Sequence, residues 1–129
     1  MSGDYHILAN IHDELNMGDY ARTLTPRLVN YAQQHDWMGR QITDLGCGSG
    51  EGSRWLSQHG YVVTGVDRSA EMLALAQTEP SSVNWVQQDI RQLSNINNMD
   101  MALALDVMHE LRSLRELETV FQGVYNILK

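Results

Sequence analysis

The residues of this chain that are best suited to bind a ligand gather around one glycine-rich segment. It reads Asp44-Leu45-Gly46-Cys47-Gly48-Ser49-Gly50-Glu51-Gly52, after an apolar strand-like stretch and before a helical pattern. Because glycine carries no Cβ, a ligand can lie directly against the backbone of such a turn. The free N–H groups at the start of the helix attract a carboxylate or a phosphate. The segment therefore predicts a binding site for a ligand with an anionic group.

An acidic residue follows this loop at a suitable distance. Asp67 stands 23 residues after Asp44 and ends a second strand-like run, residues 61–66. A carboxylate there can accept both hydroxyls of a ribose, as in the doubly wound sheets that bind adenosine-type cofactors. Turn glycines and a capping aspartate would explain each feature separately. The order and spacing of strand, loop, helix and acid together favour a cofactor site.

Dinucleotide-binding domains share much of this pattern, but their Gly-x-Gly-x-x-Gly motif fits this sequence poorly. It aligns either on Gly48, Gly50 and Ser53 or on Gly46, Gly48 and Glu51. The first alignment moves the glycines into the helix, and the second places a charge where the helix must pack closely on the strand. A P-loop is excluded because no Gly-Lys-Ser/Thr sequence occurs. An NAD-dependent oxidoreductase fragment stays as a less favoured alternative.

Two periodicities alternate along the chain and indicate the elements that position the loop. Apolar residues at helical spacing predict N-terminal helices, the second of which is expected to begin near Thr25, because Pro26 suits a first helical position. Four strand-like runs follow, at residues 41–45, 61–66, 83–86 and 99–105, and a capping box at Ser113 to Glu116 opens a last helix. Strands that alternate with helices predict an α/β fold with a parallel sheet covered on both faces.

The composition excludes several classes of protein. Nine Lys and Arg against sixteen Asp and Glu give a net charge of −7, so that a basic surface for nucleic acid or for an anionic membrane is not expected. The single cysteine excludes an internal disulfide framework and a Cys-rich zinc site. No apolar run approaches the roughly 18 residues of a membrane span, and the N-terminus lacks a signal-peptide pattern. We therefore expect a cytoplasmic protein.

The ordered motifs of residues 41–129 resemble the class I S-adenosylmethionine-dependent methyltransferases. The likeness is carried by Asp44 to Gly50, by Gly65-Val66-Asp67 with Ser69 and Met72-Leu73 after it, by Gln88-Asp89-Ile90, and by residues 100–105 and 109–111. It implies a Rossmann-like three-layer sandwich with a parallel sheet. Residues 1–40 would form an N-terminal helical cap, and residues 41–129 would bind the cofactor. Four strands would be present, because the C-terminal strands of the family would follow residue 129.

The resemblance implies a role for each matching position. The glycines of the loop would line the methionine part of S-adenosylmethionine, with Asp44 under its ammonium group, and Asp67 would accept the ribose hydroxyls. Asp89 would accept the adenine amino group, and Ile90 would pack on the ring. The full set of expected cofactor-binding residues is Asp44, Gly46, Cys47, Gly48, Gly50, Asp67, Arg68, Met72, Asp89, Ile90, Leu105 and Tyr20. S-adenosylhomocysteine (SAH) would be the product.

The catalytic residues are not identified by the sequence. Leu105 and Asp106, at the tip of the fourth strand, would border the reacting methyl group. His109 could act as a general base, since imidazole titrates near neutral pH, although a locally hydrogen-bonded histidine at a helix start is the favoured explanation. No metal is expected, because position 113 is Ser where a zinc-binding helix would need a second His.

The sequence thus predicts a methyltransferase domain, a fragment that acts on a small-molecule acceptor. A non-catalytic module that binds S-adenosylmethionine or SAH is the alternative. The fourth strand would lie at the edge of the sheet, where residues 101–105 are apolar and uncharged. Such an edge invites pairing with another chain, so that a homodimer is expected unless the N-terminal helices shield it.

Overall fold

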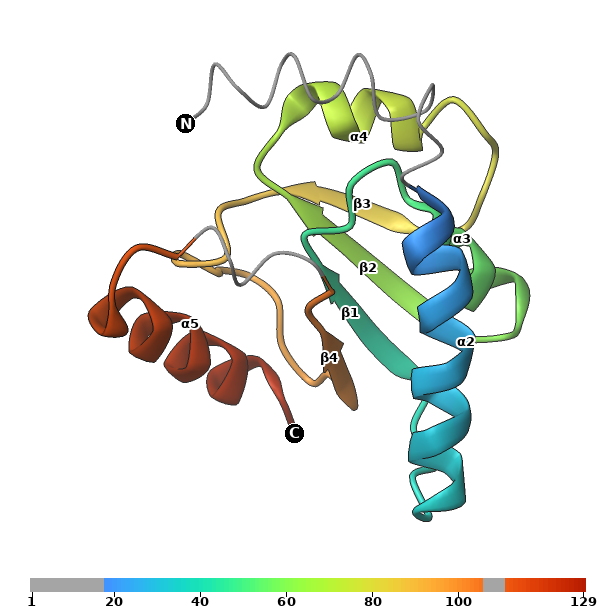
Figure 1. The fold of residues 1–129 in the computed structure, drawn as a ribbon, viewed down its shortest axis with the longest axis horizontal. Coiled ribbons are helices and arrows are strands. Elements are labelled where there is room, and N and C mark those ends of the chain that lie inside the picture. The colour runs from blue at the N-terminus through green and yellow to red at the C-terminus, as the bar shows by residue number, and fades with distance from the viewer. Residues whose placement is uncertain (1–17, 106–110) are drawn as a thin grey trace.

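The computed structural model describes residues 18–105 and 111–129, which form one four-stranded sheet with helices on both faces (Figure 1). The elements are α2 (Gly18–Gln34), β1 (Gln41–Leu45), α3 (Glu51–Gln58), β2 (Val62–Asp67), α4 (Ala70–Ala76), β3 (Asn84–Gln87), β4 (Met101–Leu103) and α5 (Leu114–Ile127). All three strand pairs are parallel, in the order β3-β2-β1-β4. The predicted α/β fold with a parallel sheet is confirmed.

The order of the strands creates a switch point beside β1. The chain moves from β1 outward through β2 to β3 and then returns to the other side of β1 with β4. At the carboxyl ends of β1 and its neighbours, Asp44 lies between Gly65 of β2 and Leu103 of β4. Ligands of doubly wound sheets bind in the crevice outside these strand ends.

The two faces of the sheet are buried by different helices. On one face, Val29 of α2 and Leu56 of α3 pack with Ile42 and Val63. On the other, Val120 and Ile127 of α5 pack with Leu45 and Val66. Figure 1 shows α2 and α3 on one side of the sheet and α5 on the other. Because successive side chains of a strand point to opposite faces, burial on both faces leaves β1 buried from Ile42 to Leu45 and β2 buried from Val63 to Asp67.

The second N-terminal helix begins earlier than the sequence predicted. It runs from Gly18 to Gln34 with Pro26 inside it, so that the expected start near Thr25 is wrong. Thr25 is only 1% exposed and lies against α3, where a Cβ on Gly52 would come within 2.6 Å of its hydroxyl oxygen. This close contact between two helices stabilises the helix across the proline, which removes one backbone hydrogen bond.

The fourth strand is shorter than predicted, because it has a partner over only a few residues. Beyond the Asp44–Leu103 pair, β1 ends at Leu45 and the chain turns away into the glycine loop. Before Met101, the chain pairs on the other side: Met99 forms a parallel bridge with Leu128, and its N–H donates to the carbonyl of Ile127 over 2.9 Å. The prediction of a strand over residues 99–105 is therefore correct only for its centre.

A tryptophan fills the space that two glycines leave above β2. A Cβ on Gly65 would lie 2.8 Å from the Trp85 ring, and one on Gly50 would lie 2.5 Å from it. We expect the substitution Gly65→Ala to lower the free energy of unfolding by about 1–3 kcal/mol, because the added methyl group overpacks this contact. Urea unfolding of parent and variant measures the difference.

A matched substitution separates packing from the loss of a glycine. Gly123, inside α5, would carry a Cβ 3.7 Å from its nearest neighbour, which is an ordinary contact. Gly123→Ala is expected to leave stability unchanged or to raise it by about 0.5–1 kcal/mol. If Gly65→Ala were as stable as the parent, this result would contradict the close packing of the Trp85 ring on Gly65.

Candidate functional site

The glycine loop is held at the carboxyl ends of β1 and β2 by backbone hydrogen bonds. The N–H groups of Gly46 and Cys47 both donate to the carbonyl of Val66, over 2.7 and 2.9 Å. Three glycines of the loop have positive φ angles: 72° at Gly46, 57° at Gly48 and 86° at Gly50. Residues with a Cβ rarely adopt such angles, so that the path of the loop depends on glycine at these positions.

Asp67 joins the glycine loop to the start of α4. Its two carboxylate oxygens accept hydrogen bonds from the N–H groups of Gly48 and Ser69, each over 2.9 Å. Its side chain is buried, and burial raises the pKa of its carboxyl above the ordinary value. The backbone N–H of Arg68 also donates a hydrogen bond to this carboxylate. A carboxylate has about four acceptor sites, so that it keeps capacity for a hydroxyl donor.

Asp44 places a second buried carboxyl beside the first. Asp44 is 5% exposed and accepts a hydrogen bond of 2.7 Å from the hydroxyl of Ser53 in α3. Burial raises the pKa of its carboxyl to about 6, and the negative charge of Asp67 acts in the same direction, against the Ser53 hydrogen bond. Two carboxylates in a buried pocket favour the binding of a cation, which would relieve their repulsion.

The buried carboxyl of Asp44 is expected to make the protein without ligand less stable as pH rises from about 4 to about 6. Within this window the folded state holds a proton that the unfolded chain has lost, so that unfolding becomes easier with rising pH. A folded pKa of about 6 corresponds to a loss of about 3 kcal/mol, at about 1.4 kcal/mol per pKa unit. Urea unfolding at pH 4, 5, 6 and 7 measures it.

The control for this prediction is Asp44→Asn, which keeps an acceptor for Ser53 but does not titrate. Its free energy of unfolding should rise relative to that of the parent as pH increases, and the difference should level off above about pH 6. Asp67, whose pKa is also raised, acts in the same direction as Asp44, and Asp100, whose pKa is lowered, acts in the opposite direction; both are present in parent and variant. A constant difference between pH 4 and 7 would contradict the assignment.

The segment after β3 carries the remaining predicted site pair, Asp89 and Ile90. Both oxygens of Asp89 bind the guanidinium of Arg91, at 2.9 and 2.6 Å, and Arg91 also reaches Glu116 of α5 at 2.8 Å. The hydrogen bonds from Arg91 lower the pKa of Asp89. Ile90 is buried in the core beside Val66. Arg91 thus holds the partly exposed carboxylate of Asp89 in one orientation.

The other predicted residues that the structure describes belong to the glycine loop, to α2 and α4, and to the segments that follow β2 and β4. Cys47 is buried and its pKa is raised well above the ordinary value, chiefly by burial, which disfavours the reactive thiolate form. Arg68 follows β2, and Met72 is buried in α4 with its N–H bound to the hydroxyl of Ser69. Tyr20 belongs to the first turn of α2, and Leu105 follows β4. Asp106 and His109 lie outside the described residues.

Sequence reasoning missed Arg54, which links the glycine loop to α4 by hydrogen bonds. Arg54 is only 6% exposed, and its guanidinium donates to the carbonyls of Ser49 and Ala76 over 2.8 and 2.9 Å. It also pairs with Glu51 at 2.8 Å and with Glu79 at 2.9 Å. A buried arginine with its donors occupied fixes the loop relative to α4. A single arginine in an amphipathic helix carries no signal that would have predicted this.

Within residues 18–105 and 111–129, no group of three or more His, Cys, Asp or Glu side chains is arranged to hold a metal ion. In the same part of the chain, the helices are too short or too polar to cross a membrane.

Known proteins match this chain from the first strand to its end. Residues 42–129 match a family described as methyltransferase domain. YqeM of Bacillus subtilis, provisionally called a methyltransferase, is 35% identical over 94 residues, which are 69% of this chain and 38% of YqeM. A malonyl-acyl-carrier-protein O-methyltransferase of Pectobacterium atrosepticum is 40% identical over 72 residues, 56% of this chain and 28% of that protein. The chain therefore spans less than half the length of these relatives.

Solved structures match over nearly the whole chain. An S-adenosylmethionine-dependent methyltransferase from Clostridium acetobutylicum superposes with a TM-score of 0.76 and 25% identity, over 97% of this chain and 53% of that one. The DhpI–SAH complex superposes with a TM-score of 0.79 over 99% of this chain and 62% of that one. At 22% identity, the second match shows the fold alone.

Proposed function

Because this chain belongs to the family of class I S-adenosylmethionine-dependent methyltransferase domains, we propose that it binds S-adenosylmethionine and transfers its methyl group to a small molecule. The observation that carries the proposal is the pair of buried carboxyls, Asp44 and Asp67, beside the glycine loop. S-adenosylmethionine carries an ammonium and a sulfonium, which an acidic pocket attracts. The pyrophosphate of a dinucleotide would be repelled by the same charges.

The residues present suit this cofactor in position as well as in charge. The ammonium group would lie near Asp44, whose raised pKa falls back when a cation neutralises the pocket. The ribose hydroxyls would donate to the free lone pairs of Asp67. The adenine amino group would donate to Asp89, which Arg91 holds in one orientation. Backbone without Cβ atoms at Gly46 and Gly48 leaves room for the methionine part between these carboxylates.

When bound, the cofactor supplies a sulfonium methyl group, which is already a good electrophile. The chain would therefore accelerate the reaction mainly by positioning: it would hold the methyl donor at the strand ends in line with the acceptor atom. We propose that the acceptor is placed next to Leu105 and Asp106 and that His109 is a candidate proton acceptor there. The net charge of −7 disfavours nucleic acid as the acceptor.

Calorimetric titration with S-adenosylmethionine, SAH and NAD tests the cofactor assignment. We expect the first two to bind and NAD to give no heat of binding. A titration in which only NAD binds would overturn the proposal. A second assay then follows SAH release in the presence of mixed small-molecule acceptors. Binding without any SAH release under these conditions would favour the non-catalytic module instead of the transferase.

We further propose that the free edge of β4 pairs with a second copy of the chain. β4 is the edge strand, and Asp100 directs its N–H toward Gln41 of β1, so that by alternation the N–H of Met101 points outward. We expect association in sedimentation velocity and slowed exchange of this amide as concentration rises. A monomer at high micromolar concentration would contradict it.

A further inference from the structure

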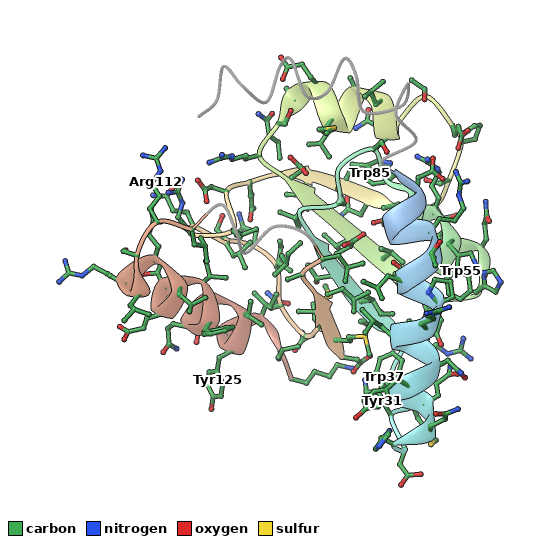
Figure 2. The ribbon with its side chains drawn as sticks, in the orientation of Figure 1. Tyr31, Trp37, Trp55, Trp85, Arg112 and Tyr125 are labelled. Atoms are coloured by element: carbon green, nitrogen blue, oxygen red, sulfur yellow. The ribbon has the colours of Figure 1, made fainter. Side chains whose placement is uncertain are left out.

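A hollow lies between α2 and α3, and none of the residues that line it belongs to the glycine loop. Its volume is about 500 Å³, and it is lined by Pro26, Arg27, Val29, Asn30, Gln33, Trp55, His59 and Tyr61. His59 caps the C-terminal end of α3 and Trp55 lies one turn into this helix, whereas the glycine loop precedes its first residue. At 1.5 Å per residue, His59 lies about 12 Å and Trp55 about 6 Å along the helix from Glu51, which directly follows the loop. In Figure 2, Trp55 lies beside α2 and Trp85 lies below α4.

The walls of this hollow are aromatic rings that are already held in position. Trp55 and His59 stack with their centroids 3.9 Å apart, and Nδ1 of His59 donates to the carbonyl of Trp55 over 2.7 Å. Tyr61 stacks on Trp37 at 5.9 Å, and its hydroxyl oxygen accepts a hydrogen bond of 2.6 Å from Gln33. Fixed rings lose little conformational entropy when a planar ligand packs between them.

The hollow offers several hydrogen-bond donors and, among the described residues, is lined by no carboxylate. In the part of the chain that the structure describes, the side chains of Arg27 and Asn30 make no hydrogen bond or ion pair. The hydroxyl of Tyr61 accepts a bond from Gln33 and donates none there. No Asp or Glu lines the hollow, although the chain as a whole carries a charge of −7. An unpaired guanidinium beside amide and phenol donors suits a carboxylate.

From this arrangement we propose that the hollow is a second ligand site, which binds a small aromatic carboxylate. The ring packs against Trp55 and Tyr61, and the carboxylate pairs with Arg27 and receives hydrogen bonds from Asn30 or the Tyr61 hydroxyl. The site is separate from the proposed cofactor site, so that its occupation does not depend on the methyltransferase assignment.

Titration with naphthalene-2-carboxylate, followed by ¹H–¹⁵N NMR of the full chain, tests the site. We expect saturable binding with a Kd of about 1 mM, the value for some 13 heavy atoms at about 0.3 kcal/mol each. The indole N–H of Trp55 and the side-chain amides of Asn30 and Gln33 should shift, while the indole of Trp85 should not. No saturation, or shifts centred on the glycine loop, would overturn the proposal.

The substitution Arg27→Gln tests the role of the charge. It should weaken the binding of naphthalene-2-carboxylate about five- to tenfold, since an exposed ion pair contributes about 1 kcal/mol. Arg115→Gln, an equal change of charge at an exposed position in α5, should change affinity less than about twofold. The neutral naphthalene-2-carboxamide should bind parent and Arg27→Gln equally. Equal carboxylate affinity in Arg27→Gln and the parent would overturn the proposal.

Discussion

Replacing Gly48 by valine is expected to weaken S-adenosylmethionine binding at least about a hundredfold while the chain stays folded. Gly48 has a φ of 57°, a left-handed conformation that a β-branched residue adopts only under strain of about 1–3 kcal/mol. Its N–H also donates to Asp67, so that a shift at this position moves the proposed ribose acceptor. The new side chain would fill the space beside the backbone. Calorimetry gives the affinity, and a circular-dichroism melt gives the stability.

Gly60→Val is the matched control for this variant. Gly60 also has a positive φ, 91°, but it follows α3 at the opposite end from the loop. Among the described residues, only the Arg40 side chain would come within 4 Å of its Cβ, at 3.4 Å. Its backbone strain should lower stability by a similar amount and leave affinity within about twofold. Binding by Gly48→Val equal to that of the parent would show that the loop does not hold the cofactor.

Replacing Asp67 by alanine is expected to weaken SAH binding by about 1–3 kcal/mol, or roughly five- to 150-fold, because a charged acceptor for two hydroxyls is lost. The melting temperature should also fall, since the N–H groups of Gly48 and Ser69 lose their partner. Calorimetry with SAH and with its 2′-deoxy analogue separates the effects. Removal of the hydroxyl should weaken binding to the parent more than to the variant.

Ser69→Ala provides the control for the structural part of this effect. Ser69 caps α4 through its hydroxyl, so that the variant should lose about 1 kcal/mol of stability while the Asp67 carboxylate stays in place. SAH affinity should stay within about threefold of the parent. If Asp67→Ala bound SAH as tightly as the parent, the ribose assignment would be wrong.

The parts of the fold that the sequence predicted well depend on short segments. The run from β1 through the glycine loop to α3 is visible because strand, turn and helix each have a local pattern within about 20 residues. The carboxyl of Asp67 is predictable in the same way, since the end of β2 must lie beside the end of β1 in a parallel crossover. The parallel direction of the four strands follows from the alternation of strands and helices, and the edge position of the fourth strand follows from the family resemblance.

The parts that sequence reasoning missed depend on contacts between distant segments. The helix across Pro26 exists because Thr25 packs on Gly52, a contact that no local pattern records. The length of β4 is set by where β1 ends and by the pairing of Met99 with Leu128. Propensities and caps are weak compared with such contacts, so that tertiary packing decides where these elements begin and end.

The chemistry of the site divides in the same way. The sequence alone determined which residue types meet at the strand ends: glycines without Cβ atoms, and the carboxyls of Asp44 and Asp67. Only the tertiary structure decided their state, because the raised pKa of Asp44 depends on burial by α3, and the orientation of Asp89 depends on Arg91. The hydrogen bonds of Arg54 to the glycine loop and the aromatic hollow between α2 and α3 likewise form only when the helices pack together. Burial and hydrogen bonding are properties of the folded surroundings, which residue spacing does not encode.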